Sequence, residues 1–362
     1  MSTSSSRKWA TVTGISLSAI ATVLASAVTT CAVAGTSPRS PDPTADQIVN
    51  QFQKNGGVFP GYRRNHAKGV CVSGYFESSG RAAHYSVAEV FASGQRTPVI
   101  GRLSIPGTNP YAWDGSTPIR GMALDFLQAN GQQWRTAMNA VPAFPVSTPA
   151  ANYEFLQAQQ PDPATGDPDP KKLAAFFASH PTADVFRNWD QTTKPSASYA
   201  TVQYNSLDAF YLVDAEGRRH AVRWSMVPEA IADGHPAPAN KPNFLAADLH
   251  RRLSRSPLRW RLVVTLANPG DPVNDAAVAW PADRRHVDAG TLVILASRPQ
   301  SIGVCRDLSF NPLVLPRGIE PSDDPLLKDR ASTYTESLRR RLREETRRHT
   351  ATPAPSSVTG SQ

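Results

Sequence analysis

The stretch Val70-Cys71-Val72-Ser73-Gly74-Tyr75-Phe76 is rich in β-branched and aromatic residues and alternates poorly between apolar and polar positions. This composition is typical of a strand that is buried on both faces. Similar runs occur at Val99 to Ser104 and at Gly121 to Phe126, with Gly and Pro residues between them. The region from 69 to 126 therefore predicts several short strands.

The rest of the chain continues this strand-rich pattern. Later strand candidates are Tyr199 to Tyr204, Ala209 to Val213, His220 to Pro228, Trp260 to Leu266 and Gly290 to Ser297. The turn sequence Asp214-Ala215-Glu216-Gly217 predicts a hairpin. Helical patterns occur at Thr44 to Lys54, Lys171 to Ser179 and Asn243 to Leu253. Strands outnumber helices without βαβ alternation, which predicts an α+β fold built on an antiparallel barrel with helical insertions.

Two segments of the predicted barrel domain are distinctive. Residues Pro142 to Pro170 are Pro-rich and, as a loop, exceed the usual length, so we expect a functional or surface-wrapping segment. Residues Thr335 to Arg348 are compatible with a basic helix. Lys and Arg outnumber acids by eight to four between residues 326 and 349, which accounts for half of the net charge of +8. No aromatic pattern accompanies this charge, so we expect no nucleic-acid partner.

Composition excludes several other classes of protein. The chain has 362 residues, 40% of them hydrophobic, which is enough for a sizeable core. The 32 Pro and 22 Gly show no collagen period, and three cysteines are too few for a disulfide scaffold. Cys71 and Cys305 could pair in an oxidising compartment, but a buried free thiol is the simpler expectation for Cys71.

The N-terminus has the pattern of an export signal. Arg7 and Lys8 precede an apolar run, and Ala32-Val33-Ala34 suits signal peptidase. We expect residues 1–34 to be a cleaved signal peptide or an uncleaved membrane anchor, followed by a linker at 35–43. We expect residues 44–348 to form one domain and residues 349–362 to form a disordered tail. The predicted location is periplasmic or otherwise extracytoplasmic, with a possible membrane tether.

Three clusters contain residue types that can carry chemistry. Around His66, a structural imidazole is the simpler interpretation of the segment alone. Asn139 precedes a Pro-containing turn, where Asn is common for backbone reasons. Arg330 and Tyr334 are four residues apart and share a helix face. A neighbouring Arg favours the phenolate, which can ligate ferric haem. Taken singly, the pair of Arg330 and Tyr334 is weak evidence for a haem ligand, and a surface contact is the simpler interpretation.

Taken together and in this order, the segments resemble the haem catalases, and most closely the bacterial catalase-related peroxidases. The resemblance runs from about residue 51 to 342 and rests on six pieces. These are Arg63-x-x-His66-Ala67-Lys68-Gly69 with Gly74-Tyr75-Phe76-Glu77, Gly101-Arg102-Leu103-Ser104 with Ile119 to Phe126, Asn139 to Phe144, Trp280-Pro281, Phe310-Asn311-Pro312 with Pro316 to Ser322, and Leu326 to Tyr334.

The resemblance implies a catalytic set around haem b. Tyr334 would be the axial iron ligand, held as phenolate by Arg330. His66 would be the distal acid/base that moves a proton between the two peroxide oxygens, leaving water and a ferryl haem. Asn139 would hold the peroxide, and Ser104 would orient His66.

The resemblance also implies the residues that bind the cofactor. Arg63, Arg102 and Arg341 lie where the family pairs arginines with haem propionates, for which a planar guanidinium is suited. Phe144 would flank the distal pocket.

Several positions depart from the family pattern. Asn65 stands where an apolar residue is usual, Leu103 replaces an aromatic, and Leu338 stands where large catalases place a His. Only 28 residues follow Tyr334, and little precedes His66 once the signal is removed. From these departures we expect an open pocket and a monomer or small homo-oligomer.

An open pocket favours a peroxidase that reduces hydrogen peroxide or an organic hydroperoxide with a small organic reductant, with at most weak catalase activity. Two alternatives stay open at this point. One is a haem catalase or a hydroperoxide-rearranging enzyme of the same fold, and the other is a non-catalytic periplasmic haem-binding barrel.

Overall fold

The computed structural model describes residues 41–232, 234 and 236–351, with side chains described up to residue 347. The predicted signal or anchor, most of the linker and most of the tail lie outside the described residues. The described residues belong to one compact unit. Within the described part of the chain, no helix has the length and apolar character needed to cross a membrane.

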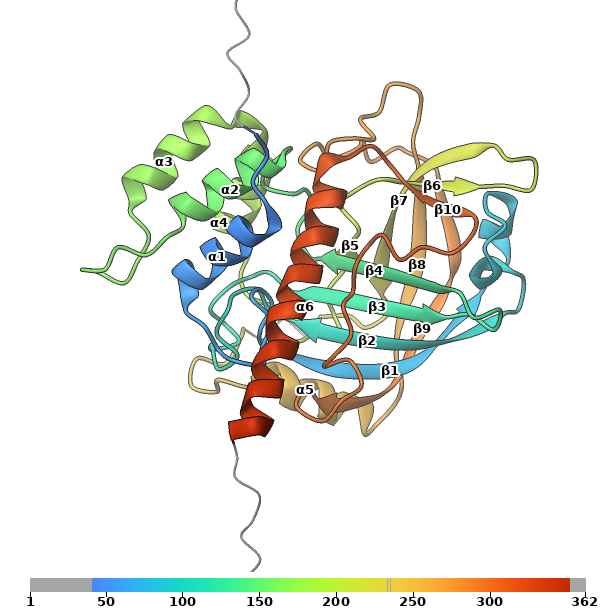
Figure 1. Cartoon of the computed structure of the whole chain (residues 1–362). Helices are drawn as coiled ribbons and strands as arrows, with labels where there is room; N and C mark the ends of the chain where they lie inside the picture. The colour runs from blue at the N-terminus through green and yellow to red at the C-terminus, as the bar shows by residue number, and fades with distance from the viewer. Residues whose placement is uncertain (1–40, 233, 235, 352–362) are drawn as a thin grey trace, which may run out of the picture. The chain divides into compact units, whose positions relative to one another are not determined.

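Eight antiparallel strands close into a barrel (Figure 1). Following the hydrogen-bonded order, the ring runs β7-β5-β4-β3-β2-β1-β9-β8, and the pairing of β8 with β7 closes it. Strands β6 and β10 extend from β7 outside the ring. The strands are β1 Gly69–Ser78, β2 Arg96–Ser104, β3 Gly121–Leu127, β4 Gln133–Asn139, β5 Tyr204–Asn205, β6 Phe210–Val213, β7 Arg219–Pro228, β8 Leu258–Leu266, β9 His286–Pro299 and β10 Ile319–Pro321. This is the predicted α+β antiparallel barrel.

Aromatic side chains fill the main core of this barrel. Along β4 buried and half-buried residues alternate, as the two-residue period of a strand requires. The indole of Trp134 stacks on Phe126 with 4.5 Å between ring centroids and meets Trp224 edge-on at 5.1 Å. Because these rings are fully buried, they fix which face of each strand points into the core and which points away from it.

In the part of the chain that the structure describes, six α-helices accompany the barrel. They are α1 Ala45–Gly56, α2 Pro149–Ala158, α3 Pro170–Ser179, α4 Asp184–Thr192, α5 Phe244–Leu253 and α6 Pro325–Ala351. Short 3-10 turns lie at Arg81–His84, Glu89–Phe91 and Pro181–Ala183. In Figure 1, α1 to α4 lie on one side of the long helix α6 and the barrel lies on the other. Arg340 of α6 donates to Asp46, Asn50 and Gln53 of α1, which ties the two helices together.

Most expected elements are present at nearly the expected bounds. The helix that begins after Thr44 has a capping box, with reciprocal bonds between Thr44 and Gln47. The hairpin around Asp214 to Gly217 joins β6 and β7. In the expected strand Tyr199 to Tyr204, only Tyr204 is in a strand.

Two expectations about connecting segments are wrong. Residues Pro142 to Pro170 are not one loop, because Thr148 caps a helix whose first residue is Pro149. Proline is favoured at that first position, where its missing N–H costs nothing. The buried thiol expected at Cys71 is instead half of a disulfide with Cys305. Both cysteines are nevertheless buried, so the expected environment is present and only the free thiol is not.

Candidate active site

One row of residues crosses five neighbouring strands of the barrel. In the pairing register, Gly69, Ser104, Gly121, Asn139 and Asn205 lie directly opposite one another in turn. Paired residues on adjacent strands share a face, and here that face points away from the main core. Strand spacing places Ser104 and Asn139 about 10 Å apart, with Gly121 between them. The register thus explains why residues from separate sequence segments meet.

His66 is held next to this row by its own backbone and its neighbour. Its φ of 53° lies in the left-handed region, which is uncommon outside glycine and marks a constrained position. The side-chain oxygen of Asn65 accepts hydrogen bonds from the backbone N–H of His66 at 2.8 Å and of Gly107 at 2.9 Å. Asn65, which stands where the family pattern has an apolar residue, therefore stabilises the turn that contains His66.

The imidazole of His66 packs against Ser104 and Gly121. Its Nδ1 lies 3.0 Å from Ser104 Oγ, which fixes one ring nitrogen and leaves Nε2 without a hydrogen bond among the described residues. A Cβ on Gly121 would lie 2.9 Å from Cε1 of the same ring. Glycine at position 121 is therefore what gives the ring its space, a role that sequence reasoning did not assign.

The surroundings of His66 keep its ring neutral. Burial lowers its pKa to about 3, and the positive charges of Arg102, Arg330 and Arg63 add to that shift. A neutral imidazole with one free nitrogen can accept a proton, which is what a general base requires.

Helix α6 carries the predicted iron ligand Tyr334 together with Arg330 and Arg341. The guanidinium carbon of Arg330 lies 6.0 Å from the centre of the Tyr334 ring. Arg330 donates to the carboxylate of Asp208 and, at 3.0 Å, to the carbonyl of Ala137 on β4. Sequence reasoning placed Arg330 beside Tyr334 but missed Asp208, whose side chain is only 1% exposed.

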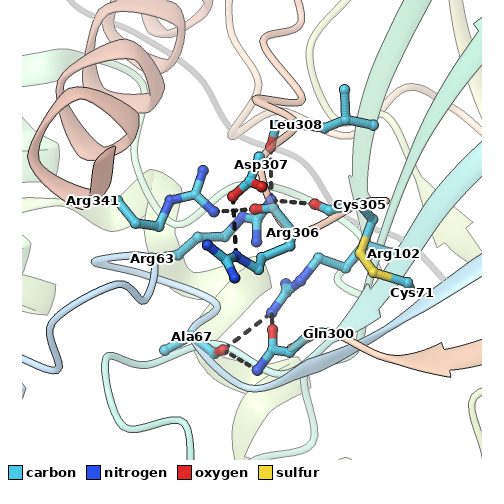
Figure 2. The surroundings of a disulfide bond; sticks show 10 residues. All are labelled: Arg63, Ala67, Cys71, Arg102, Gln300, Cys305, Arg306, Asp307, Leu308 and Arg341. Carbon is cyan, nitrogen blue, oxygen red and sulfur yellow. Dashed lines mark hydrogen bonds and ion pairs between the residues drawn. A yellow bond between two sulfur atoms is a disulfide. The ribbon is translucent and has the colours of Figure 1, made fainter. Parts of the chain in front are cut away.

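Three arginines from separate elements gather near one loop (Figure 2). Arg63 donates to the carbonyls of Cys305 at 2.9 Å and Leu308 at 2.7 Å. Arg102 donates to the side chain of Gln300 at 2.7 Å. Arg341 donates to a carbonyl in the same loop. Sequence reasoning predicted these three arginines but not the loop that supplies their acceptors.

The chemistry of the three arginines fits a group with two carboxylates. None of them forms an ion pair within 4 Å with a described carboxylate, and the Nε atoms of Arg102 and Arg341 are buried without a hydrogen-bond partner among the described residues. Burial and mutual repulsion lower the pKa of Arg63 well below its ordinary value. Asp307 and Glu345 offset the positive charge of this cluster only in part. Three close guanidinium groups, of which Arg102 and Arg341 are buried, form a site for anions, so the residues fit the propionates of haem.

Phe144 packs against an apolar cluster that does not include the three arginines. It is half-buried against the apolar cluster that includes Val141, Phe155 and Leu326, and its backbone N–H donates to Ala276. The structure thus places Phe144 where the helical insertion meets the start of α6. Its predicted place beside the distal pocket remains a prediction.

Comparison with known proteins identifies the family. Residues 58–350 match the family model described as catalase. A catalase-related peroxidase of Synechococcus elongatus is 37% identical over 90% of this chain and 96% of its own length. One from Mycolicibacterium paratuberculosis is 31% identical over 82% and 95%. A fungal catalase crystal structure has a TM-score of 0.68 at 21% identity, covering 78% of this chain, which spans 60% of that longer protein.

The fold and the site define a haem-binding barrel enzyme, and the chain belongs to the catalase family. Within that family it is a haem peroxidase of the catalase-related group.

Proposed function

We propose that this enzyme uses haem b to reduce hydrogen peroxide or an organic hydroperoxide with a small organic electron donor. The overall reaction is ROOH + AH₂ → ROH + H₂O + A, in which the donor loses two electrons and two protons. The observation that carries this proposal is the neutral His66, oriented by Ser104 beside the positive charges of Arg102 and Arg330.

The chain's own residues would handle protons and orientation. Tyr334 would supply the oxygen ligand to iron, and the arginine cluster would bind the propionates. His66 would accept a proton from the peroxide oxygen that stays and return it to the oxygen that leaves, so that the leaving group departs neutral. Asn139, two strands from Ser104 on the same face, would donate a hydrogen bond to the peroxide. When bound, haem supplies the redox chemistry that these side chains lack.

Peroxidase rather than catalase turnover is supported by the relatives at 37% and 31% identity, both named catalase-related peroxidase. A cavity of about 190 Å³ beside Arg63 and Arg341, lined also by Tyr62, Gln300 and Arg306, offers room for a small donor near the carboxylate site. At most weak dismutation of hydrogen peroxide is therefore expected.

We further propose that the protein is exported to the periplasm or another extracytoplasmic space, with a possible N-terminal tether. The disulfide between Cys71 and Cys305 is of the kind that persists in oxidising compartments. A monomer or small homo-oligomer is the proposed assembly.

The test compares the haem spectrum and the rate of peroxide reduction of His66→Gln and Tyr334→Phe with those of the parent enzyme. The parent should bind haem and oxidise an organic donor with peroxide much faster than it releases oxygen from peroxide alone. His66→Gln should keep the haem spectrum and lose about 10²- to 10⁴-fold in rate. Haem binding without turnover in the parent would favour a non-catalytic haem-binding barrel. Unchanged turnover in His66→Gln would overturn the role of His66 as acid/base, and rapid oxygen release from peroxide alone would favour a catalase.

A further inference from the structure

The loop from Pro299 to Leu308 follows β9 and supplies an acceptor to each of the three arginines of the carboxylate site. Its carbonyls at Cys305 and Leu308 accept from Arg63. The carbonyl of Arg306 accepts from Arg341, and Gln300 accepts from Arg102. The arginines come from the His66 segment, β2 and α6, so this loop is their shared support (Figure 2).

The loop is exposed on one side and buried on the other, and it is also tied to Ala67 through Gln300 and to Glu345 of α6 through Arg306. Ile302 and Val304 are exposed, with 72% and 67% of their surface in solvent, whereas Cys305 is fully buried. Cys305 lies in a small apolar cluster with Cys71 and Phe310, and the disulfide joins it to Cys71. A Cβ on Gly303 would lie 2.5 Å from Cys71 Sγ, so the loop packs directly on that sulfur.

The other end of the disulfide lies on the strand next to Arg102. Cys71 of β1 is paired in register with Arg102 of β2. The bond therefore connects the loop, across 234 residues of sequence, to the strand pair that carries one of the three arginines.

The arginines need such support because they repel one another. The charges of Arg102 and Arg341 act unfavourably on Arg63, and Asp307 offsets this repulsion only in part. Asp307 and Glu345 act favourably on Arg341, but neither forms an ion pair within 4 Å with any of the three arginines. A freely moving loop would let these long side chains turn toward solvent. The conformational entropy lost when they are ordered again would then weaken the binding of a carboxylate.

We propose that the Cys71–Cys305 disulfide is a positioning element of the haem-carboxylate site, holding the loop whose acceptors preorganise Arg63, Arg102 and Arg341. This inference rests on the haem site proposed above. It predicts that haem affinity depends on the disulfide through the propionates and not through the stability of the barrel alone.

The experiment uses the full chain with and without the double substitution Cys71→Ala/Cys305→Ala. Haem release to excess apomyoglobin should be about tenfold faster or more in the variant, which corresponds to losing one charge-assisted hydrogen bond. Val304→Ser, on the exposed side of the same loop, is the matched control and should release haem at the parent rate. Thiol titration of the unfolded, unreduced parent should find only Cys31 free.

Haem dimethyl ester separates positioning from general stabilisation. The ester lacks carboxylates, so parent and variant should bind it equally if the disulfide acts through the arginines. An equal loss for haem and its ester would overturn the proposal, as would unchanged haem release or three free thiols in the parent. If the parent binds neither haem nor the ester, the haem function itself fails, which is a distinct result.

Discussion

The carboxylate of Asp208 forms a buried ion pair with the guanidinium of Arg330, the residue one helical turn before the predicted iron ligand. Arg330 also donates to Ala137 of β4, so the pair joins α6 to the barrel wall close to Asn139. Removing one partner of a buried pair leaves the other charge uncompensated.

Asp208→Ala should therefore lower the free energy of unfolding by about 3 kcal/mol, measured by urea denaturation. Asp208→Asn, which keeps an acceptor, should lose less. The exposed pair of Arg96 and Glu77 is the comparison, and Glu77→Ala should cost below about 1 kcal/mol. Equal losses in the two pairs would show that burial of Asp208 does not matter.

A methyl group at position 121 should displace the ring of His66, the proposed acid/base. In Gly121→Ala the new Cβ would meet His66 at 2.9 Å and Ser104 Oγ at 3.0 Å. We expect peroxidase turnover to fall about 100-fold, the usual effect of a misplacement near 1 Å, with haem content unchanged. Steady-state rates normalised to the Soret absorbance test this. A full rate in Gly121→Ala would mean that the ring position is not set by this contact.

The side chain of Asn65 should matter for both stability and rate. Asn65→Ala removes the acceptor of two backbone N–H groups and leaves the left-handed conformation of His66 less supported. The expected loss is about 1 to 3 kcal/mol of unfolding free energy, together with slower peroxide reduction. Asn65→Asp keeps the acceptor oxygen and should restore most of both. Thermal unfolding and turnover are measured on the three proteins side by side.

Asp329 on α6 should make stability depend on pH in mildly acidic solution. Burial raises the pKa of this carboxyl to about 6, from an ordinary value near 4. Between these values the folded protein holds more protons than the unfolded chain, so the unfolding free energy falls as pH rises, and this loss is complete above pH 6.

Asp329→Asn should remove the part of the slope that Asp329 contributes and stabilise the protein at pH 7 by about 3 kcal/mol. Asp324, whose pKa burial also raises to about 6, should keep its own contribution. Asp323→Asn, at an exposed position just before the helix, is the control and should leave the profile unchanged. Denaturant midpoints between pH 4 and 8 provide the measurement. A steeper slope in Asp329→Asn than in the parent would contradict the expected sign.

The barrel was predictable because its strands carry a local pattern. The runs at 70–76, 99–104 and 121–126 are apolar enough to be recognised one by one. Strand β4 was not anticipated because Gln133 and Arg135 alternate with Trp134 and Thr136, which lowers the mean hydropathy of the run. The helix at Pro149 has no clear local signal, because prolines are common in loops although Pro is also favoured at a helix start.

The family motifs predict the residues of the candidate site, whereas the residues that support them from far away in the sequence have no such motif. Asp208 is separated from Arg330 by 122 residues, and no local pattern marks a buried ion pair. The pairing of Cys71 with Cys305 likewise depends on where the loop after β9 returns, which no short segment specifies. Gly121 matters only because the register places it between Ser104 and Asn139.

Helix α6 carries Tyr334 and Arg341 seven residues apart, which is nearly two complete turns. The rise of an α-helix places their Cα atoms about 10 Å apart and on almost the same face. Helical pitch alone thus sets the span from the predicted iron ligand to a predicted carboxylate partner. Inserting one residue between them would rotate Arg341 by about 100° around the helix axis. Substitutions within the interval should therefore be tolerated far better than any change in its length.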